Sequence, residues 1–128
     1  MKWRSLRKKS DFQKVYDKGV KRVGRLVVVY LLSADDTAGS VVASRKIGSA
    51  VKRNRAKRLL REALRNGLLG QPGGVTSVCE RFFPDSGGDP SLRSGEPGLW
   101  VVLVARYRIL DAKAQDVRDE LNDLLSRH

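Results

Sequence analysis

SAVKRNRAKRLLREALRNG, residues 49–67, contains seven basic residues and a single acidic residue, Glu62. Gly48-Ser49 is typical of a helix start and Asn66-Gly67 of a helix end, so the stretch predicts one helix. At about 100° per residue, the apolar residues share one face of that helix: Ala56, Leu59, Leu60 and Ala63. The opposite face carries Asn54, Lys57, Arg58, Arg61 and Arg65. We expect the first face to pack on a sheet and the second to form a cationic stripe.

The start of this helix carries the wrong charge for an isolated helix. Helix N-termini favour acids, and Lys52, Arg53 and Arg55 there each cost about 0.3–1 kcal/mol at low salt. Phosphate groups would reverse the sign of these terms and would accept hydrogen bonds from the first backbone amides. Arginine also binds phosphate through two parallel hydrogen bonds. A solvated charged face is the ordinary interpretation, but charges of one sign beside a second basic segment favour nucleic acid.

The whole positive excess lies in the first half of the chain. The protein has 128 residues, a net charge of +12 and a pI near 10.5. Residues 1–66 hold 19 of the 26 basic residues but only 5 of the 14 acidic ones. This asymmetry indicates a binding face for a polyanion more strongly than the total charge does.

The sequence also indicates in which cellular compartment to expect the protein. Its single cysteine, Cys79, cannot form an internal disulfide, which favours a reducing environment. The start MKWRSLRKKSDF lacks the apolar core of a secretory signal, and no apolar run approaches the roughly 18 residues of a membrane span. We therefore expect a cytoplasmic protein without a membrane partner.

Upstream of residue 48 the pattern predicts a helix and two strands. Ser10 is a candidate helix cap, with Gln13 as its capping-box partner, and Gly19 is a candidate stop. Phe12, Val15 and Tyr16 fall on one face of that helix. RLVVVYLL predicts a strand from about Leu26 to Leu32. After the turn SADDTAG, SVVASRK predicts a second strand, and we expect the two strands to pair as a hairpin.

Residues 67–98 hold eight of the 12 glycines and all 4 prolines, so we expect a long flexible insertion there. GLWVVLVAR then predicts a buried strand. A C-terminal helix capped near Asp111 follows, with an apolar stripe of Ala114, Val117, Leu121, Leu124 and Leu125. The order of elements predicts a single α+β domain over residues 1–128, a two-layer sandwich of helices on a small, mostly antiparallel sheet.

These segments together resemble a known family. RKIGSAVKRNRAKRLLREALR, with DFQKVYDKG upstream, is similar to the protein subunit of bacterial ribonuclease P. AVKRNRAKRLLRE matches that family's signature, which centres on Arg53-Asn54-Arg55. The resemblance covers residues 1–66 and resumes with LWVVLVARYRILDAKAQDVRDELNDLL. Two departures are Leu26, where the family often has an aromatic residue, and the length of the 67–98 insertion, to which we assign no RNA contact.

The resemblance implies a fold and a set of partners. The family's sandwich has a left-handed β-α-β crossover, against the usual right-handed rule. Its protein binds a catalytic RNA subunit, and the RNA, with Mg²⁺ held mainly by RNA and substrate, removes the 5′ leader of precursor tRNA. By this resemblance, the RNA subunit would face the basic helix and the residues just before it: Arg45, Lys46, Lys52, Arg53, Asn54, Arg55, Lys57, Arg58, Arg61 and Arg65. Asn54 there has four possible contacts: a base edge, a hydroxyl, a hydrated metal ion or its own backbone.

The resemblance also implies a cleft for the single-stranded leader, with Phe12, Tyr16 and Tyr30 as its aromatic residues. Exposed aromatic rings stack on unpaired bases at about 1–3 kcal/mol each, with little sequence preference. The alternative interpretation is a place in the core, which suits Phe12 best, whereas a tyrosine hydroxyl needs water or a partner. Lys14, Lys18 and Arg25 would line the same groove with positive charge.

The sequence offers no protein active site. His128 is the only histidine, and Cys79 has no histidine near it in the sequence. Asp35-Asp36 suits a turn, and no paired-cysteine zinc motif or phosphate-binding loop is present. We therefore expect no catalytic or metal-binding residues, and catalysis by the RNA of the holoenzyme.

Three other functions remain to be weighed against this one. A structural RNA-binding protein of the ribosomal type would need the basic helix but no aromatic groove. A DNA-binding module is disfavoured because no helix precedes the basic helix across a short turn. A membrane-surface helix is disfavoured because its apolar face lacks aromatic residues. No obligate protein partner is inferred.

Overall fold

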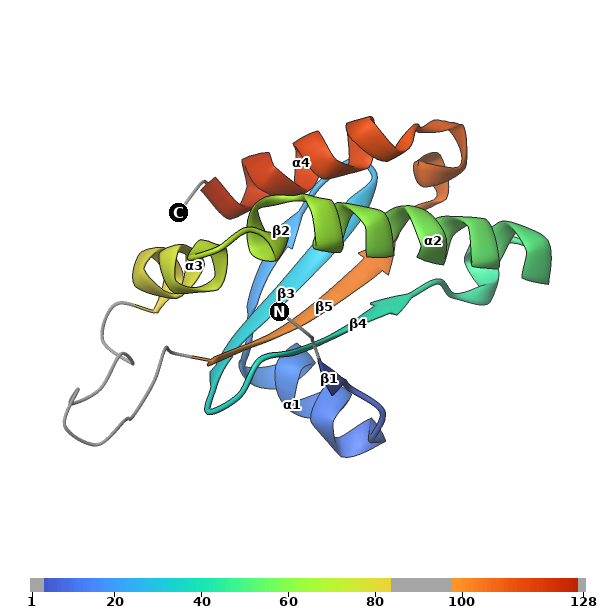
Figure 1. Ribbon diagram of the computed structural model, residues 1–128. Helices are drawn as coiled ribbons and strands as arrows, with labels where there is room; N and C mark the ends of the chain where they lie inside the picture. The colour runs from blue at the N-terminus through green and yellow to red at the C-terminus, as the bar shows by residue number, and fades with distance from the viewer. Residues whose placement is uncertain (1–3, 84–97, 127–128) are drawn as a thin grey trace, which may run out of the picture.

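The computed structural model describes residues 4–83 and 98–126, and Figure 1 shows a mixed sheet with helices on both faces. Helices α2 (Ala50–Asn66), α3 (Gly74–Phe82) and α4 (Ala114–Ser126) lie on one face, and α1 (Lys9–Lys18) lies on the other (Figure 1). Within the described residues, the short 3₁₀ helices η1 (Arg45–Ile47), η2 (Leu68–Gly70) and η4 (Tyr107–Asp111) connect these elements. The expected α+β class is confirmed, with α1 as a partial cover on the second face.

The sheet has five strands in the order β1-β4-β5-β3-β2. They are β1 (Arg4–Ser5), β2 (Val20–Val23), β3 (Val27–Ala34), β4 (Ala38–Val42) and β5 (Gly98–Ala105). β3 pairs antiparallel with β2 and β5, whereas β4 pairs parallel with β5 and β1. The connection from β4 through α2 and α3 to β5 is therefore a β-α-β crossover.

The predicted hairpin between the strands at residues 26–32 and 40–46 is wrong. β5 lies between β3 and β4 in the sheet, and the short strand β2, which the sequence analysis missed, is the hairpin partner of β3. β5 carries apolar side chains on both faces, GLWVVLVA, so the central position removes the most apolar surface from water. The strand at residues 40–46 also ends early, at Val42, because Arg45–Ile47 turns into η1.

Helix α2 has the two faces that the sequence predicts. Ala56, Leu60 and Ala63 are buried in the core under the helix layer. The Ser49 hydroxyl accepts a hydrogen bond from the Lys52 amide at 3.4 Å, and the helix ends at Gly67. A serine N-cap of this kind satisfies one of the otherwise unpaired amides of the first turn.

The predicted N-terminal caps of the other two helices are wrong, whereas the predicted end of α1 at Gly19 is confirmed. Ser10 lies inside α1, which begins at Lys9 after an N-cap residue without a side-chain bond, and Gln13 instead donates to Asp17 at 2.9 Å. Asp111 lies in η4, and the start of α4 is closed by Asp116, which accepts a hydrogen bond from the Lys113 amide at 3.0 Å. The apolar stripe of α4 is confirmed at four of its five positions, since Ala114 is half-buried.

The flexible insertion predicted for residues 67–98 is wrong for its first part. Residues Leu68–Gly70 and Gly74–Phe82 are helical, and Val75, Val78, Cys79 and Phe82 of α3 are buried. These side chains belong to the same core cluster as α2, α4 and β5. The spacing of Val75, Val78 and Phe82 is helical, and burial of that face outweighs the glycine content around it. Residues 84–97 lie outside the described part of the chain.

Val78→Ala tests whether α3 belongs to the core. The Val78 side chain is fully buried, so removing two methyl groups should lower the free energy of unfolding by about 2 kcal/mol. Urea unfolding followed by circular dichroism measures it, with Ser77→Ala on the more exposed side of α3 as the control. Equal midpoints for the two variants would mean that α3 is not packed against the rest of the protein.

Candidate RNA interface

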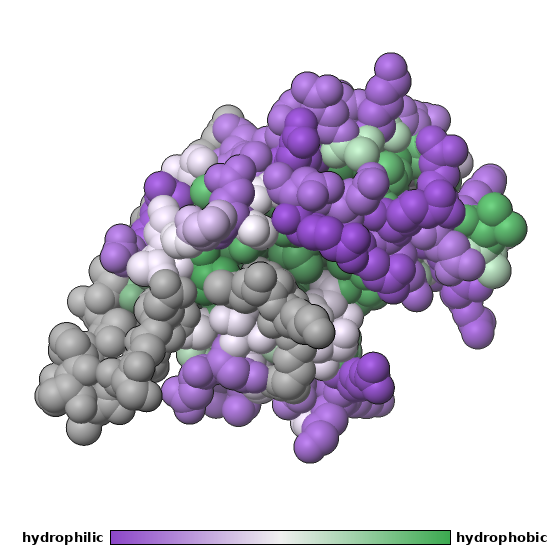
Figure 2. All heavy atoms as spheres, viewed as in Figure 1, coloured by the Kyte–Doolittle hydropathy of each residue, from purple (hydrophilic) through white to green (hydrophobic). Residues whose placement is uncertain are grey.

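The basic side chains of α2 lie on the surface. Lys52, Asn54, Arg55, Arg58, Arg61 and Arg65 are exposed, and Arg53 and Lys57 are half-buried. Figure 2 shows hydrophilic residues gathered over the helix side of the molecule, where α2 runs across the view. The sequence-derived stripe therefore exists as a surface.

No carboxylate in the described part of the chain pairs with these charges. Among residues 4–83 and 98–126, none of the basic side chains of α2 forms an ion pair with a carboxylate. The Nε atom of Arg53 is buried and has no hydrogen-bond partner in that part of the chain. Because a buried donor without a partner is costly, the Arg53 side chain would gain by turning this nitrogen outward to an acceptor supplied from outside.

Arg45 and Lys46 extend this basic surface at the start of α2. Both are exposed in η1, whose Ile47 is buried and fixes the turn to the core. Gly48 has φ 132°, a backbone conformation that side chains with a Cβ rarely adopt, and it turns the chain from η1 into α2. The two segments therefore present one continuous cationic face, here called the basic face: Arg45, Lys46, Lys52, Arg53, Asn54, Arg55, Lys57, Arg58, Arg61 and Arg65.

Phe12, Tyr16 and Tyr30 form a row on the other side of the sheet. The Phe12 and Tyr16 rings are 6.3 Å apart, and the Tyr16 and Tyr30 rings meet edge to face at 4.8 Å. On β3, Val27, Val29 and Leu31 point into the helix layer, so Tyr30 points toward α1. The structure thus brings together three aromatic residues from α1 and β3 that lie up to 18 positions apart.

The aromatic row is only partly covered. Tyr16 is 37% exposed, whereas Phe12 and Tyr30 are half-buried against a small cluster built around Val15 and Val102. Burial raises the pKa of the Tyr16 phenol, and the Tyr30 hydroxyl next to it adds to the effect, so the phenol stays neutral at physiological pH. The rings are held in place by the sheet and remain within reach of solvent.

One lysine, which the sequence analysis missed, lies beside this row, and another lies beside the Trp100 ring on the same face of the sheet. The Lys21 ammonium lies 5.8 Å from the Tyr30 ring, and the Lys14 ammonium lies 5.8 Å from the Trp100 ring. Lys21 was missed because β2 was not expected, and Trp100 because its strand was assigned wholly to the core. The period of two along β5 would have placed Trp100 on the α1 face.

Two of the residues predicted for the cleft, Lys18 and Arg25, are not shown in contact with the aromatic row. Lys18 is exposed at the end of α1. Arg25 lies in the turn between β2 and β3, about 17 Å along the strand from Tyr30 if each residue advances about 3.4 Å. The structure therefore groups Phe12, Lys14, Tyr16 and Tyr30 but not Arg25.

The part of the chain that the structure describes contains no group of three or more histidine, cysteine or acidic residues placed to bind a metal ion. In the same residues, no helix is both long and apolar enough to cross a bilayer.

Known proteins of one family match this chain. The family model described as ribonuclease P matches residues 1–78. A ribonuclease P protein component of Symbiobacterium thermophilum is 33% identical over 95% of this chain and 88% of its own length. One from Clostridioides difficile is 29% identical over 97% of this chain and 90% of its own length.

Solved structures agree on the fold. The ribonuclease P protein of Staphylococcus aureus aligns with a TM-score of 0.64 at 23% identity, over 98% of this chain and 94% of that one. The protein from Thermotoga maritima aligns with a TM-score of 0.64 at 22% identity, over 99% and 98%. With the family match over residues 1–78 and the near full-length relatives, this chain belongs to the ribonuclease P protein component family, the protein subunits of the endoribonuclease that matures the 5′ ends of tRNA.

Proposed function

We propose that the protein is a single RNA-binding domain with two RNA contacts. The basic face binds the catalytic RNA subunit, and the row of Phe12, Tyr16 and Tyr30 holds the single-stranded 5′ leader of precursor tRNA. The observation that carries the proposal is the arrangement of this row, three partly covered rings on the sheet face away from α2 with Lys21 beside Tyr30. A structural RNA-binding protein would need the basic face alone.

The basic face suits folded RNA because it offers many unpaired cations on a rigid helix. Five arginines on α2 can each bind phosphate oxygens through two parallel hydrogen bonds. The exposed Asn54 lies among them and offers both a donor and an acceptor to a base edge or a ribose hydroxyl. The half-buried Arg53 supplies the unpaired Nε donor at the edge of the face.

The aromatic row suits an unpaired strand because stacking does not depend on base identity. Each base that stacks on a ring contributes about 1–3 kcal/mol, and lysines beside the rings attract the phosphates between the bases. The leaders of different precursor tRNAs differ in sequence, and a sequence-tolerant contact distinguishes precursor from mature tRNA for all of them.

We assign cleavage itself to the RNA with Mg²⁺, an ion that, when bound, would supply Lewis-acid chemistry for hydrolysis of the phosphodiester. Mg²⁺ prefers carboxylate and phosphate oxygens, whereas the basic face contains no carboxylate and helix α2 carries only one, Glu62. These residues fit the phosphates around such an ion better than they fit the ion itself. The protein then contributes by placing the RNA and the leader.

Tyr16→Ala and Tyr30→Ala should each weaken the binding of precursor tRNA to the holoenzyme about tenfold, because each removes a stacking surface. Binding of mature tRNA, which lacks the leader, should be unchanged. Equilibrium binding of both tRNAs to holoenzyme reconstituted with each variant measures this difference.

Tyr16→Phe and Tyr30→Phe are the matched controls, since they keep the ring and remove only the hydroxyl. They should bind precursor tRNA within about twofold of the parent protein. Equal losses for precursor and mature tRNA in the alanine variants would show that the row does not contact the leader.

A further inference from the structure

A second basic and aromatic site lies at the end of the sheet, outside the basic face and the aromatic row. Arg25, Arg106, Tyr107 and Arg108 line a pocket of about 490 Å³, here called the Arg–Tyr pocket. They come from the turn between β2 and β3, the residue after β5 and the start of η4. No part of the sequence analysis assigned a function to Arg106, Tyr107 or Arg108.

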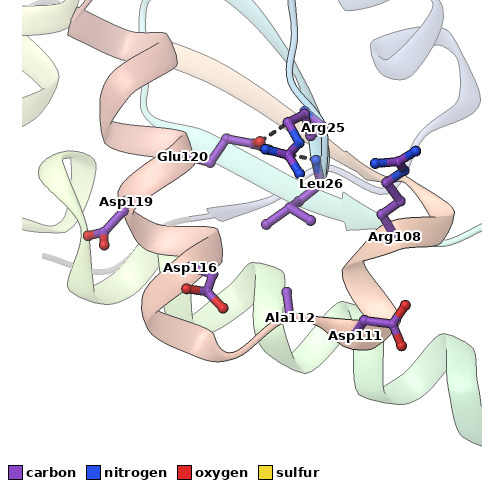
Figure 3. A pocket seen from close by; sticks show the side chains of 8 residues that line it. All are labelled: Arg25, Leu26, Arg108, Asp111, Ala112, Asp116, Asp119 and Glu120. Carbon is purple, nitrogen blue, oxygen red and sulfur yellow. Dashed lines mark hydrogen bonds between the residues drawn. The ribbon is translucent and has the colours of Figure 1, made fainter.

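The backbone around this pocket is fixed by hydrogen bonds. The Arg106 amide donates to the Leu26 carbonyl at 2.9 Å, and its guanidinium Nη1 donates to the Gly24 carbonyl at 2.7 Å. The Arg25 amide donates to the Glu120 carboxylate at 2.9 Å (Figure 3). The end of β5 and the turn after β2 are therefore held together, and the three arginines are kept on one short edge of the molecule.

Tyr107 is the most exposed aromatic side chain that the structure describes, at 65% of its surface. Within residues 4–83 and 98–126 it has no hydrogen bond or ring contact, and Arg108 has none either. A free ring among three arginines matches the chemistry of one nucleotide in a strand, which has a flat base and a singly charged phosphodiester group on either side. The pocket offers a stacking surface together with phosphate ligands.

The surroundings show from which side such a nucleotide would come. Next to the Arg–Tyr pocket, Arg25 and Arg108 also line a pocket whose other side carries carboxylates of α4 and η4: Asp111, Asp116, Asp119 and Glu120 (Figure 3). Those carboxylates repel phosphate, so an RNA strand cannot follow the α4 side. On its other side, η4 packs against η1 and α2, and Ile109 shares the core with Ile47. The element that carries Tyr107 and Arg108 thus packs against η1, the element that carries Arg45 and Lys46 of the basic face.

We propose that the Arg–Tyr pocket binds an unpaired nucleotide of the catalytic RNA subunit, whose base stacks on Tyr107 and whose phosphate is held by Arg25 and Arg108. This inference rests on the proposed binding of that RNA by the basic face, which it extends across η4. The leader is the less suitable occupant, because Leu26 beside the pocket lies about 14 Å along β3 from Tyr30.

The test is the binding of each variant to the catalytic RNA subunit alone, without tRNA, over a series of salt concentrations. Tyr107→Ala should weaken binding about tenfold and leave the salt dependence unchanged, because stacking displaces no counterions. Arg108→Gln should weaken binding and reduce the slope of log affinity against log salt by about one unit. Lys113→Gln, which removes one exposed charge outside the pocket, is the matched control, and Tyr107→Phe should bind as the parent does.

Each outcome decides the proposal. If the parent protein binds the RNA subunit tightly and both Tyr107→Ala and Arg108→Gln bind it equally well, the proposed binding of a nucleotide in the pocket is wrong. The proposed function would then still stand. If these variants bind the RNA subunit normally but their holoenzymes bind precursor tRNA more weakly, the pocket contacts the leader. That result would also contradict the proposed binding of a nucleotide of the RNA subunit. A parent protein that does not bind the RNA subunit would overturn the proposed function first.

Discussion

The affinity of the protein for the catalytic RNA should fall about 10³-fold when monovalent salt rises from 50 to 200 mM. This expectation follows from about six phosphates neutralised by the basic face, which release their condensed counterions on binding. Six phosphates are fewer than the nine lysines and arginines of the basic face. The number is lower because Arg53 and Lys57 are half-buried and not every exposed side chain reaches a phosphate. Titration of labelled RNA at several salt concentrations measures the slope.

Single substitutions locate the contacts that produce this slope. Arg58→Ala and Arg61→Ala should each flatten it by about one unit if each side chain touches a phosphate. Both residues are exposed on α2, so their removal should not disturb the core, unlike that of Arg53. With Lys113→Gln as the control, slopes that stay at the parent value in both variants would contradict contact between this face and RNA.

Glu120→Ala should lower the free energy of unfolding by about 3–4 kcal/mol. One carboxylate oxygen accepts the Arg25 amide at 2.9 Å, and the other accepts the amides of Leu26 and Val27 at 2.8 and 3.0 Å. Hydrogen bonds to a charged group are stronger than neutral ones, and without Glu120 two part-buried amides lose their partner. Urea unfolding followed by circular dichroism measures the loss.

Asp119→Asn is the control for this substitution. It removes the same charge from the neighbouring residue of α4, on a side chain that is exposed, and should change stability by less than about 0.5 kcal/mol.

Gly24 explains why the Glu120 carboxylate can approach the turn so closely, since a Cβ at position 24 would lie 2.6 Å from Glu120 Oε2. If both variants unfold at the parent midpoint, Glu120 does not fix the turn.

The local parts of the fold could be predicted because their signals are local. The apolar face of α2 and the stripe of α4 follow from spacing within one helix, and β3 and β5 follow from runs of β-branched residues. The position of β5 between β3 and β4 could not be predicted, because it depends on which distant strand buries most apolar surface. β2 was missed because VKRV is short and only half-covered, and α3 because the glycines and prolines around it resemble a loop.

The site was predicted in outline for a different reason. The signature around Arg53-Asn54-Arg55 identified the family, and helical spacing placed Phe12 beside Tyr16. Contact between Tyr16 and Tyr30 depends on the packing of α1 against β3, which the resemblance implied and which no local pattern encodes. The pairing of Arg106 with the β2–β3 turn is also set by strand register, so the Arg–Tyr pocket had no signal in the sequence.

The central place of β5 in the sheet has a consequence for how the protein folds during its synthesis on the ribosome. Until Ala105 has been synthesised, the central strand between β3 and β4 is incomplete, and only the two-residue strand β1, which pairs with β4, can link the part that contains α1, β2 and β3 to the part that contains β4 and α2. Such late, long-range pairing is slow and leaves open strand edges exposed. The synthesis of β5, late in translation, therefore fixes the geometry between the two proposed RNA contacts, and a product terminated before β5 would carry the residues of both without a fixed relation between them.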